Sequence, residues 1–379
     1  MPVSSSQPLV VLPIIGTRPE AVKMAPLVNL LKAQPENFRV VTCVTAQHRT
    51  MLDQVMNFFG VVPDFDLNIM KEGQTLTQVT SRALEGLESV LMDVKPDIVL
   101  AQGDTTTVLA ASLAAAYQKI AFGHVEAGLR TDNRFDPFPE ELNRRLTTQL
   151  TDMHFAPTTQ SRDNLLREGV ENEKIYLTGN TVIDALKQVA KNRVHSTDGR
   201  RMLLVTTHRR ENWGAPLEGI ALALKDILEA FPDTHLVLPM HKNPIVREPL
   251  QRILGANPRV ELIEPPDYLD FVRLMEKSHL ILTDSGGVQE EAPALGLPVL
   301  VLRRTTERPE GVSAGTASLI GTDRADIVAA ASKLLSDQNA YDEMSHAANP
   351  YGDGLAGQRI AQAMLHFAGR GARPDDFVV

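Results

Sequence analysis

His279-Leu280-Ile281-Leu282-Thr283-Asp284-Ser285-Gly286-Gly287-Val288-Gln289-Glu290-Glu291 is the stretch that decides the fold. It reads as an apolar strand, a turn of small residues, and a helix with two carboxylates in its first turns. The apolar run 296–302 follows as the next buried strand. A strand, a helix and a second strand in this order form a βαβ unit, so the stretch predicts a parallel sheet.

The start of this predicted helix is suited to an anion. The first N–H groups of a helix have no partner within it, and the helix dipole makes that end attractive to a group such as a pyrophosphate. Gly286 and Gly287 would let a phosphate reach the backbone, whereas Glu290 or Glu291 would accept hydrogen bonds from ribose hydroxyls. The sequence Asp-Ser-Gly-Gly alone is equally compatible with an anion site and with a turn that merely caps the helix. Its place between two apolar strands favours the binding interpretation.

The composition is typical of an ordinary globular protein. A chain of 379 residues exceeds what one core usually serves, so we expect two domains. The net charge of −9 argues against a nucleic-acid or anionic-membrane surface and favours a small partner held in a local pocket. The apolar run Leu9–Ile15 lacks the preceding positive charge of a signal peptide, and no segment approaches membrane-spanning length. We therefore expect a cytoplasmic protein, with the single Cys43 as a buried thiol.

Short runs rich in Val, Ile and Leu alternate with helical stretches along the chain. This alternation predicts an α/β fold with two Rossmann-like doubly wound domains, whose parallel sheets face each other across a cleft. The polar segment Ala190–Arg201 reads as the linker. The expected strands are Leu9–Ile15, Arg39–Val44, Asp97–Leu100, Ile120–Gly123, Met153–Phe155, Ile175–Leu177, Met202–Val205, His235–Leu238, Val260–Ile263, Leu280–Leu282 and Val299–Leu302.

Ligands of such sheets bind beyond the carboxyl ends of the strands, and this chain places its polar groups there. In the first half, Asp104 follows one strand and precedes an Ala-rich helix over Val108–Tyr117, which suits either an N-cap or a catalytic acid. Glu126 ends the next strand beside Ala127-Gly128, where it has no core to pack against, and this favours a functional role. His124 shares its strand face, but a metal site would need a third ligand.

Glu140 and Glu141 follow Pro139 at a predicted helix start, where they could act in catalysis or simply complement the helix dipole. In the second half, His208 ends a strand and opens a basic cluster, which favours contact with a leaving group over a packed core histidine. Guanidinium groups beside Gly, Pro or strand ends could fork onto phosphate or form surface ion pairs. These are Arg18, Arg209, Arg210 and Arg308. His154, His235 and His279 read as structural, while Trp213 either walls the pocket or anchors its loop.

The chain closely resembles the bacterial non-hydrolysing UDP-N-acetylglucosamine 2-epimerases from about Leu9 to Ile360. The motifs are jointly specific. They are Gly16-Thr17-Arg18-Pro19-Glu20-Ala21, Thr45-Ala46-Gln47-His48-Arg49, Gly103-Asp104-Thr105-Thr106, His124-Val125-Glu126-Ala127-Gly128-Leu129-Arg130, Pro139-Glu140-Glu141, Thr178-Gly179-Asn180-Thr181, His208-Arg209-Arg210-Glu211-Asn212, Thr283–Pro293, Thr305-Thr306-Glu307-Arg308-Pro309-Glu310 and Asn349-Pro350-Tyr351-Gly352-Asp353-Gly354.

The resemblance implies a GT-B-type fold in a homodimer. It implies one domain over 1–185, which a C-terminal helix at about 358–379 rejoins, and a UDP-binding domain over 186–357. It also implies catalytic roles for Asp104, Glu126, Glu140 and His208, and no metal or nicotinamide cofactor. The substrate ligands that it implies are Arg18, Lys23, Arg144, His208, Phe271, Ser285, Gly286, Gly287, Glu291 and Arg308.

Two positions depart from the family pattern. Pro266 stands where some relatives have a glutamine near the uridine. Gly73 stands where some relatives have an arginine at an allosteric substrate site, although Gln47, Arg209 and His241 match other members of that site. The expected reaction interconverts UDP-N-acetylglucosamine and UDP-N-acetylmannosamine through loss and return of UDP, for surface polysaccharide synthesis. The alternatives are a hydrolysing 2-epimerase, an enzyme for a UDP-diacetamido uronate, a GT-B glycosyltransferase and a nucleotide-sugar sensor.

Overall fold

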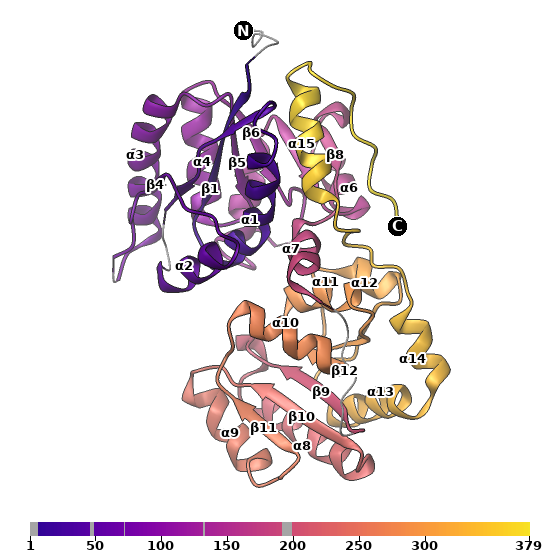
Figure 1. Cartoon of the computed structure of the whole chain (residues 1–379). Coiled ribbons are helices and arrows are strands. Elements are labelled where there is room, and N and C mark those ends of the chain that lie inside the picture. The colour runs from indigo at the N-terminus through magenta and orange to yellow at the C-terminus, as the bar shows by residue number, and fades with distance from the viewer. Residues whose placement is uncertain (1–6, 46–48, 72, 132, 192–198) are drawn as a thin grey trace. The chain divides into compact units, whose positions relative to one another are not determined.

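The computed structural model describes residues 7–45, 49–71, 73–131, 133–191 and 199–379. The chain divides into two compact units. The first comprises Met1–Ala185 and Gly352–Val378, and the second comprises Leu186–Tyr351 with Val379. Figure 1 shows that each unit contains a β-sheet flanked by helices. Among the described residues, no helix is both long enough and apolar enough to cross a membrane.

The first unit contains an eight-stranded sheet over its described residues, in the order β4-β3-β1-β5-β6-β7-β8, with β2 also paired to β1. The strand pairings are parallel. Its strands are β1 Leu9–Ile15, β2 Phe38–Val40, β3 Cys43–Val44, β4 Phe65–Asp66, β5 Ile98–Gln102, β6 Ala121–Val125, β7 Met153–Ala156 and β8 Ile175–Leu177. Its helices are α1 Arg18–Lys32, α2 Arg49–Phe58, α3 Leu76–Val94, α4 Thr106–Tyr117, α5 Glu140–Thr148, α6 Thr159–Arg167, η1 Asn172–Lys174 and α15 Ala356–Phe367, while α7 Thr181–Val189 continues into the second unit.

The second unit contains a six-stranded parallel sheet over its described residues, in the order β11-β10-β9-β12-β13-β14. Its strands are β9 Arg201–Thr206, β10 Thr234–Pro239, β11 Val260–Ile263, β12 Ser278–Thr283, β13 Val299–Val301 and β14 Ala317–Leu319. Its helices are η2 Arg210–Asn212, α8 Ala215–Ala230, α9 Pro244–Leu254, α10 Tyr268–Lys277, α11 Gly286–Ala294, α12 Pro309–Ser313, α13 Arg324–Ser336 and α14 Gln338–Ser345. Strands β10 and β11 lie on one side of β9, and β12, β13 and β14 lie on the other. Because β9 and β12 pair in parallel, their carboxyl ends are adjacent, with Thr206 opposite Thr283.

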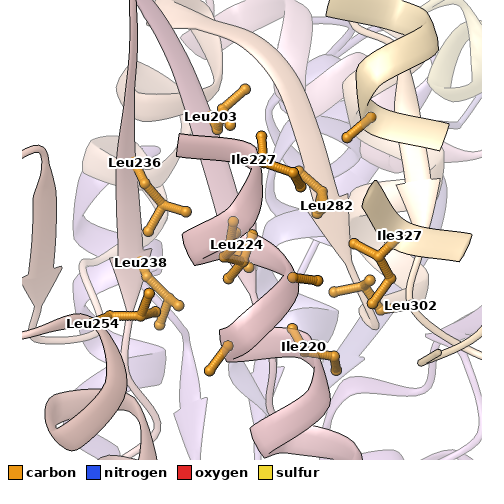
Figure 2. Close-up of a cluster of buried hydrophobic side chains, with 14 of the residues drawn as sticks. Leu203, Ile220, Leu224, Ile227, Leu236, Leu238, Leu254, Leu282, Leu302 and Ile327 are labelled. Carbon is orange, nitrogen blue, oxygen red and sulfur yellow. The ribbon is translucent and has the colours of Figure 1, made fainter. Parts of the chain in front are cut away.

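The core of the second unit lies where α8 packs on the sheet. Figure 2 shows Ile220, Leu224 and Ile227 of α8 among the side chains of strand residues such as Leu236 and Leu282. These side chains are fully buried, and each such burial stabilises the fold by roughly 1.5 to 3 kcal/mol relative to exposure. The apolar strands are covered by helices and therefore lack the alternation of a half-exposed sheet.

The predicted strand positions agree well with the structure, with local differences. The predicted strand Arg39–Val44 is divided into β2 and β3, because the N–H of Thr42 donates to the Asp64 carboxylate (2.8 Å) instead of to a neighbouring strand. The short strands β4 and β14 were not predicted, since two or three residues are too few to show a period. Of the predicted linker Ala190–Arg201, residues 192–198 lie outside the described part of the chain, and Arg201 already begins β9.

The predicted C-terminal helix is shorter than expected. Helix α15 ends at Phe367, and the remaining chain is an irregular tail. Figure 1 shows the tail in yellow, running past β8. There the N–H of Phe377 donates to the carbonyl of Leu177 (2.8 Å), and the Phe377 ring is buried. The tail thus covers part of an edge strand whose backbone groups would otherwise be exposed.

Candidate active site

The turn from β12 to α11 has the geometry predicted for an anion site. Ser285 is the N-cap of α11, but its hydroxyl makes no capping hydrogen bond to the first N–H groups of the helix. Gly286 leaves room for the Arg308 side chain, because a Cβ would lie 3.0 Å from the guanidinium carbon and that side chain would have to shift. Gly287 is more open, since a Cβ would meet atoms only at 3.7 Å and beyond. The helix terminus therefore combines backbone N–H groups with an adjacent arginine.

Arg308 is held over this helix terminus by two carboxylates. Its Nε lies 2.7 Å from Glu290 and its Nη1 lies 3.0 Å from Glu307. Glu290 is 1% exposed and pairs with Arg308, which favours Glu291, the other candidate, for the ribose contact. Glu307 also pairs with Arg209 (2.9 Å) and Arg303 (2.6 Å). Burial would raise the pKa of Glu307, but these guanidinium groups lower it to about 2.

His208 follows β9, beside the turn that contains Asp284. Its Nδ1 lies 2.9 Å from Asp284 Oδ1 while nearly half of its side chain is exposed, and Asp284 itself is fully buried. The same carboxylate accepts hydrogen bonds from the N–H groups of His208 and Arg209 and from the Asn212 amide. Burial alone would raise the pKa of Asp284, but the His208 interactions and the backbone donors lower it below its ordinary value.

Glu291 lies on α11 and faces α10. It is 6% exposed and accepts a hydrogen bond from the Tyr268 hydroxyl (2.8 Å). Burial is the largest cause that raises the pKa of Tyr268, so this hydroxyl remains a donor. Phe271, a predicted substrate contact, lies nearly one turn after Tyr268 and is half-buried. The second unit thus brings His208, Ser285, Gly286, Gly287, Glu291 and Arg308 to the carboxyl edge of its sheet.

In the first unit, Glu126 is held by three donors. Its carboxylate accepts hydrogen bonds from Lys23 and Gln102 and from the Asn180 amide (2.9 Å). Glu126 is 7% exposed, and the partners that enclose its carboxylate are polar groups. Its φ of +66° lies in the left-handed region that residues other than glycine seldom adopt. Such strain at a polar site is typical of functional residues.

Asp104 follows β5 and pairs with α5. Arg144 Nη1 lies 2.6 Å from its carboxylate, and Asn143 donates to its carbonyl (2.8 Å). Asp104 is not the N-cap of α4, because Thr105 occupies that position. The Asp104 side chain is 29% exposed, yet desolvation raises its pKa above the ordinary value. The Arg144 charge lowers this pKa, whereas the charges of Glu126 and Glu140 raise it further. Three carboxylates therefore influence one another in this unit.

Helix α5 carries Glu140 and Arg144 on one rigid element. Glu140 is its first residue and is half-buried. Glu141 is fully buried and pairs with Arg144 (3.0 Å) and Arg145 (2.8 Å), so the surface-acid interpretation is wrong for Glu141. Because Glu141 holds Arg144, it also fixes the guanidinium that contacts Asp104.

The first turn of α1 contributes the remaining residues of the first unit. Arg18 is the first residue of α1 and is half-buried, and Lys23 lies further along α1 in contact with Glu126. Gly16 packs against Thr107, since a Cβ would lie 2.4 Å from its hydroxyl. Glu20 is 2% exposed and accepts the N–H of Gly16 (2.5 Å). Burial raises its pKa to about 7.

The residues considered for metal or allosteric sites make the following contacts. His124 is buried, bonds to the carbonyl of Gly103 (2.7 Å), and has a pKa lowered to about 4 by burial; no group of potential metal ligands occurs within the described residues. Arg209 pairs with Glu307, His241 accepts the N–H of Asn243 (3.2 Å), and Gln47 lies outside the described residues. Cys43 is buried as predicted.

The remaining histidines and aromatic residues pack as structural groups. His154 lies buried in β7, and burial lowers its pKa to about 3. His279 stacks on Tyr341 with ring centroids 4.3 Å apart. The exposed Arg210 has its guanidinium carbon 6.0 Å from the centroid of the Trp213 ring.

Comparison with known proteins identifies the family of this chain. The sequence profile described as UDP-N-acetylglucosamine 2-epimerase matches residues 30–365 of this chain. The chain belongs to the UDP-N-acetylglucosamine 2-epimerase family. Its similarity to the UDP-N-acetylglucosamine 2-epimerase of Bacillus subtilis is 55% identity over 97% of this chain and 98% of the relative. Membership makes the protein an isomerase-family enzyme and confirms the family resemblance.

Solved structures extend this finding to the fold. The Neisseria meningitidis UDP-GlcNAc 2-epimerase, solved with UDP-GlcNAc, is 47% identical, with a TM-score of 0.85 over 94% of this chain and 100% of that chain. A glycosyltransferase of kitacinnamycin is only 13% identical, yet has a TM-score of 0.65 over 95% of this chain and 99% of that chain, which shows the shared fold alone. The predicted GT-B-type class, with two parallel-sheet α/β domains, is confirmed.

Sequence reasoning did not predict which residues hold the carboxylates and arginines of this 2-epimerase-family site, although Glu141, Asn180 and Glu307 stood in its motifs. Gln102 and Asn180 hold Glu126, Glu141 holds Arg144, and Glu307 holds Arg308. Gln102 ends β5 and Asn180 precedes α7, so their positions at carboxyl ends of strands were a usable signal. Glu307 lies within the motif that begins at Thr305. Only its ion pairs with Arg209, Arg303 and Arg308 show that it holds the arginine at the helix terminus.

Proposed function

We propose that this protein epimerises C2 of UDP-N-acetylglucosamine to give UDP-N-acetylmannosamine, by elimination and re-addition of UDP through a 2-acetamidoglucal. C2 bears the acetamido nitrogen and has no adjacent carbonyl carbon, so its proton is too weakly acidic for a lone carboxylate to remove. Loss of UDP from C1 must therefore accompany loss of the proton. The observation that carries this proposal is the presence of proton-handling carboxylates and an anion-binding helix terminus in one chain.

The second unit would bind and stabilise the UDP that departs. The N–H groups at the start of α11 and the Arg308 guanidinium would neutralise charge that develops on the β-phosphate. Ser285, Gly286 and Gly287 would contribute further phosphate contacts, while Glu291 and Phe271 would contact the nucleoside. His208 would donate to the leaving phosphate oxygen. These groups keep UDP in place for its return.

The first unit would handle the C2 proton. Glu126, held by Lys23 and the Asn180 amide, would remove or return the proton on one face of the ring. Asp104, whose pKa desolvation raises above its ordinary value, would take part as a second proton-handling carboxylate. Glu140 would share in this exchange, and Arg144 would keep Asp104 oriented. Return of the proton to the opposite face of C2 inverts that carbon.

Deuterium exchange tests the proposal. The protein is incubated with UDP-N-acetylglucosamine in deuterated water, and the products are followed by NMR. Epimerisation predicts deuterium at C2 of intact UDP-sugar and formation of UDP-N-acetylmannosamine. Free N-acetylmannosamine would indicate the hydrolysing reaction instead, and absence of exchange would refute both. The same incubation with a UDP-diacetamido uronate tests the related substrate.

The elimination and re-addition scheme itself requires neither a nicotinamide nor a metal ion. We therefore expect turnover to survive dialysis against a chelator. We also propose that the protein acts in the cytoplasm as a homodimer that binds neither nucleic acid nor membrane, and supplies UDP-N-acetylmannosamine to surface polysaccharide synthesis. Light scattering of the purified chain tests the dimer directly.

A further inference from the structure

The aspartate of the Asp284-Ser285-Gly286-Gly287 turn has no role in the scheme above, yet it is the most enclosed carboxylate near the helix terminus. Asp284 is 0% exposed. It accepts hydrogen bonds from two backbone N–H groups, from the Asn212 amide, and from the His208 ring. It therefore lies behind His208 on the side of the ring opposite Nε2.

We propose that Asp284 is a positioning residue that holds His208 with Nδ1 protonated, and so directs Nε2 toward the phosphate of the departing UDP. This inference rests on the proposed function, since it assigns His208 to the leaving group. An ionised carboxylate can only accept hydrogen bonds, so His208 Nδ1 must be the donor across the 2.9 Å contact. The other ring nitrogen then points away from the buried carboxylate.

The surroundings of Asp284 support its ionised state. Burial alone would favour the neutral acid, but the His208 ring and the backbone donors together hold the pKa of Asp284 below its ordinary value. At neutral pH the carboxylate therefore carries a negative charge next to the imidazole. A ring that carries protons on both nitrogens would bridge the Asp284 carboxylate through Nδ1–H and an approaching phosphate through Nε2–H. Nε2–H can then donate to the oxygen that leaves C1 without any rotation of the ring.

The fold explains why this pair forms from residues 76 positions apart. Strands β9 and β12 are neighbours in the sheet, with Thr206 opposite Thr283, so His208 and Asp284 both lie just beyond the carboxyl ends. Asn212 bonds to Asp284 (3.0 Å) and to the carbonyl of Leu302 (3.1 Å), which anchors the carboxylate from a second direction. The ring is thus oriented by contacts that do not involve substrate.

Histidine-selective ¹⁵N NMR of the full chain tests the inference, with the His208 signals assigned from the spectrum of His208→Gln. In the wild-type protein we expect His208 Nδ1 to be protonated, both alone and with saturating UDP. A neutral ring protonated only on Nε2 would overturn the proposal. This measurement needs no Asp284 variant and does not depend on which sugar is the substrate.

Asp284→Asn supplies the second measurement. An amide can present its NH₂ to Nδ1, so the ring should change to the Nε2–H form; kcat should then fall by about 100-fold or more, as loss of the correct histidine tautomer does elsewhere. UDP affinity, measured by calorimetry, should change by less than about threefold, since a neutral Nε2–H still donates.

Asn212→Ala is the matched control, because it removes another partner of the same carboxylate and leaves the His208 contact in place. We expect this variant to keep the wild-type tautomer and most of kcat. Equal loss of kcat in both variants without a tautomer change would show a merely structural role and refute the inference. If Asp284→Asn does not fold, the NMR measurement of the His208 tautomer in the wild-type protein tests the inference by itself. Absence of deuterium exchange in the wild type would refute the proposed function and leave the tautomer result standing.

Discussion

Replacement of Glu20 by glutamine should stabilise the protein, and only above mildly acidic pH. Glu20 lies in the first turn of α1 at 2% exposure, and its Oε2 accepts the N–H of Gly16. Its Oε1 is buried without a hydrogen-bond partner of standard geometry among the described residues. Nearby Thr17 and Thr105 lower its pKa only in part, so desolvation dominates and the folded pKa is about 7.

The magnitude follows from the difference between the folded and unfolded pKa. The folded pKa of about 7 exceeds the ordinary value of 4.5 by about 2.5, which is equivalent to about 3 to 4 kcal/mol at roughly 1.4 kcal/mol for each pKa unit. Since the folded pKa is raised, the unfolded chain loses its proton first as pH rises. The free energy of unfolding therefore falls between pH 4.5 and 7, and the whole penalty is present above pH 7. Glutamine does not ionise and retains an oxygen that accepts the Gly16 N–H.

Thermal and urea unfolding of both proteins from pH 4 to 8.5 would measure this effect. We expect the stability difference at low pH to reflect packing alone, and to increase by about 3 kcal/mol in favour of Glu20→Gln above pH 7. For a unit of this size, that corresponds to an increase in melting temperature of roughly 6 to 12 °C. Glu88→Gln, on an exposed position of α3, is the control and should show no such increase. A pH-independent difference, or a less stable variant at pH 8, would refute the reasoning.

Further substitutions test the site and the fold. Glu126→Gln and Asp104→Asn should each lower kcat by about 10²- to 10⁴-fold while calorimetry still detects UDP binding; normal turnover would remove that residue from catalysis. Arg308→Ala should weaken UDP binding by about 2 kcal/mol, because it removes a charged donor at the helix terminus, and unchanged affinity would contradict its role. Asp184→Ala should cost about 1 to 2 kcal/mol of unfolding free energy, because Asp184 accepts the N–H groups of Ala356 and Gly357 at the start of α15. Phe377→Ala should cost about 3 kcal/mol, and a smaller effect in denaturation would show that the tail is not anchored there.

The sequence alone was enough to predict the fold class and the places where polar residues gather. Buried parallel strands appear as apolar runs because both of their faces are covered, and this signal is local in the chain. The strands β1, β8 and β11 were predicted with the bounds that the structure shows. The turn after β12 was predicted as a helix start because Asp-Ser-Gly-Gly follows an apolar run, and Ser285 is indeed the N-cap of α11.

Only the tertiary structure decided which groups hold one another. Glu126 looked like an unsupported strand end, yet its carboxylate is held by Lys23, 103 positions away, and by Asn180, 54 positions away. Glu290 looked available for a ribose, yet Arg308 occupies it. Asp284 looked like part of a phosphate turn, yet it faces His208. Such pairings depend on strand order and register, which join residues distant in sequence, whereas strand and helix signals depend on neighbours along the chain.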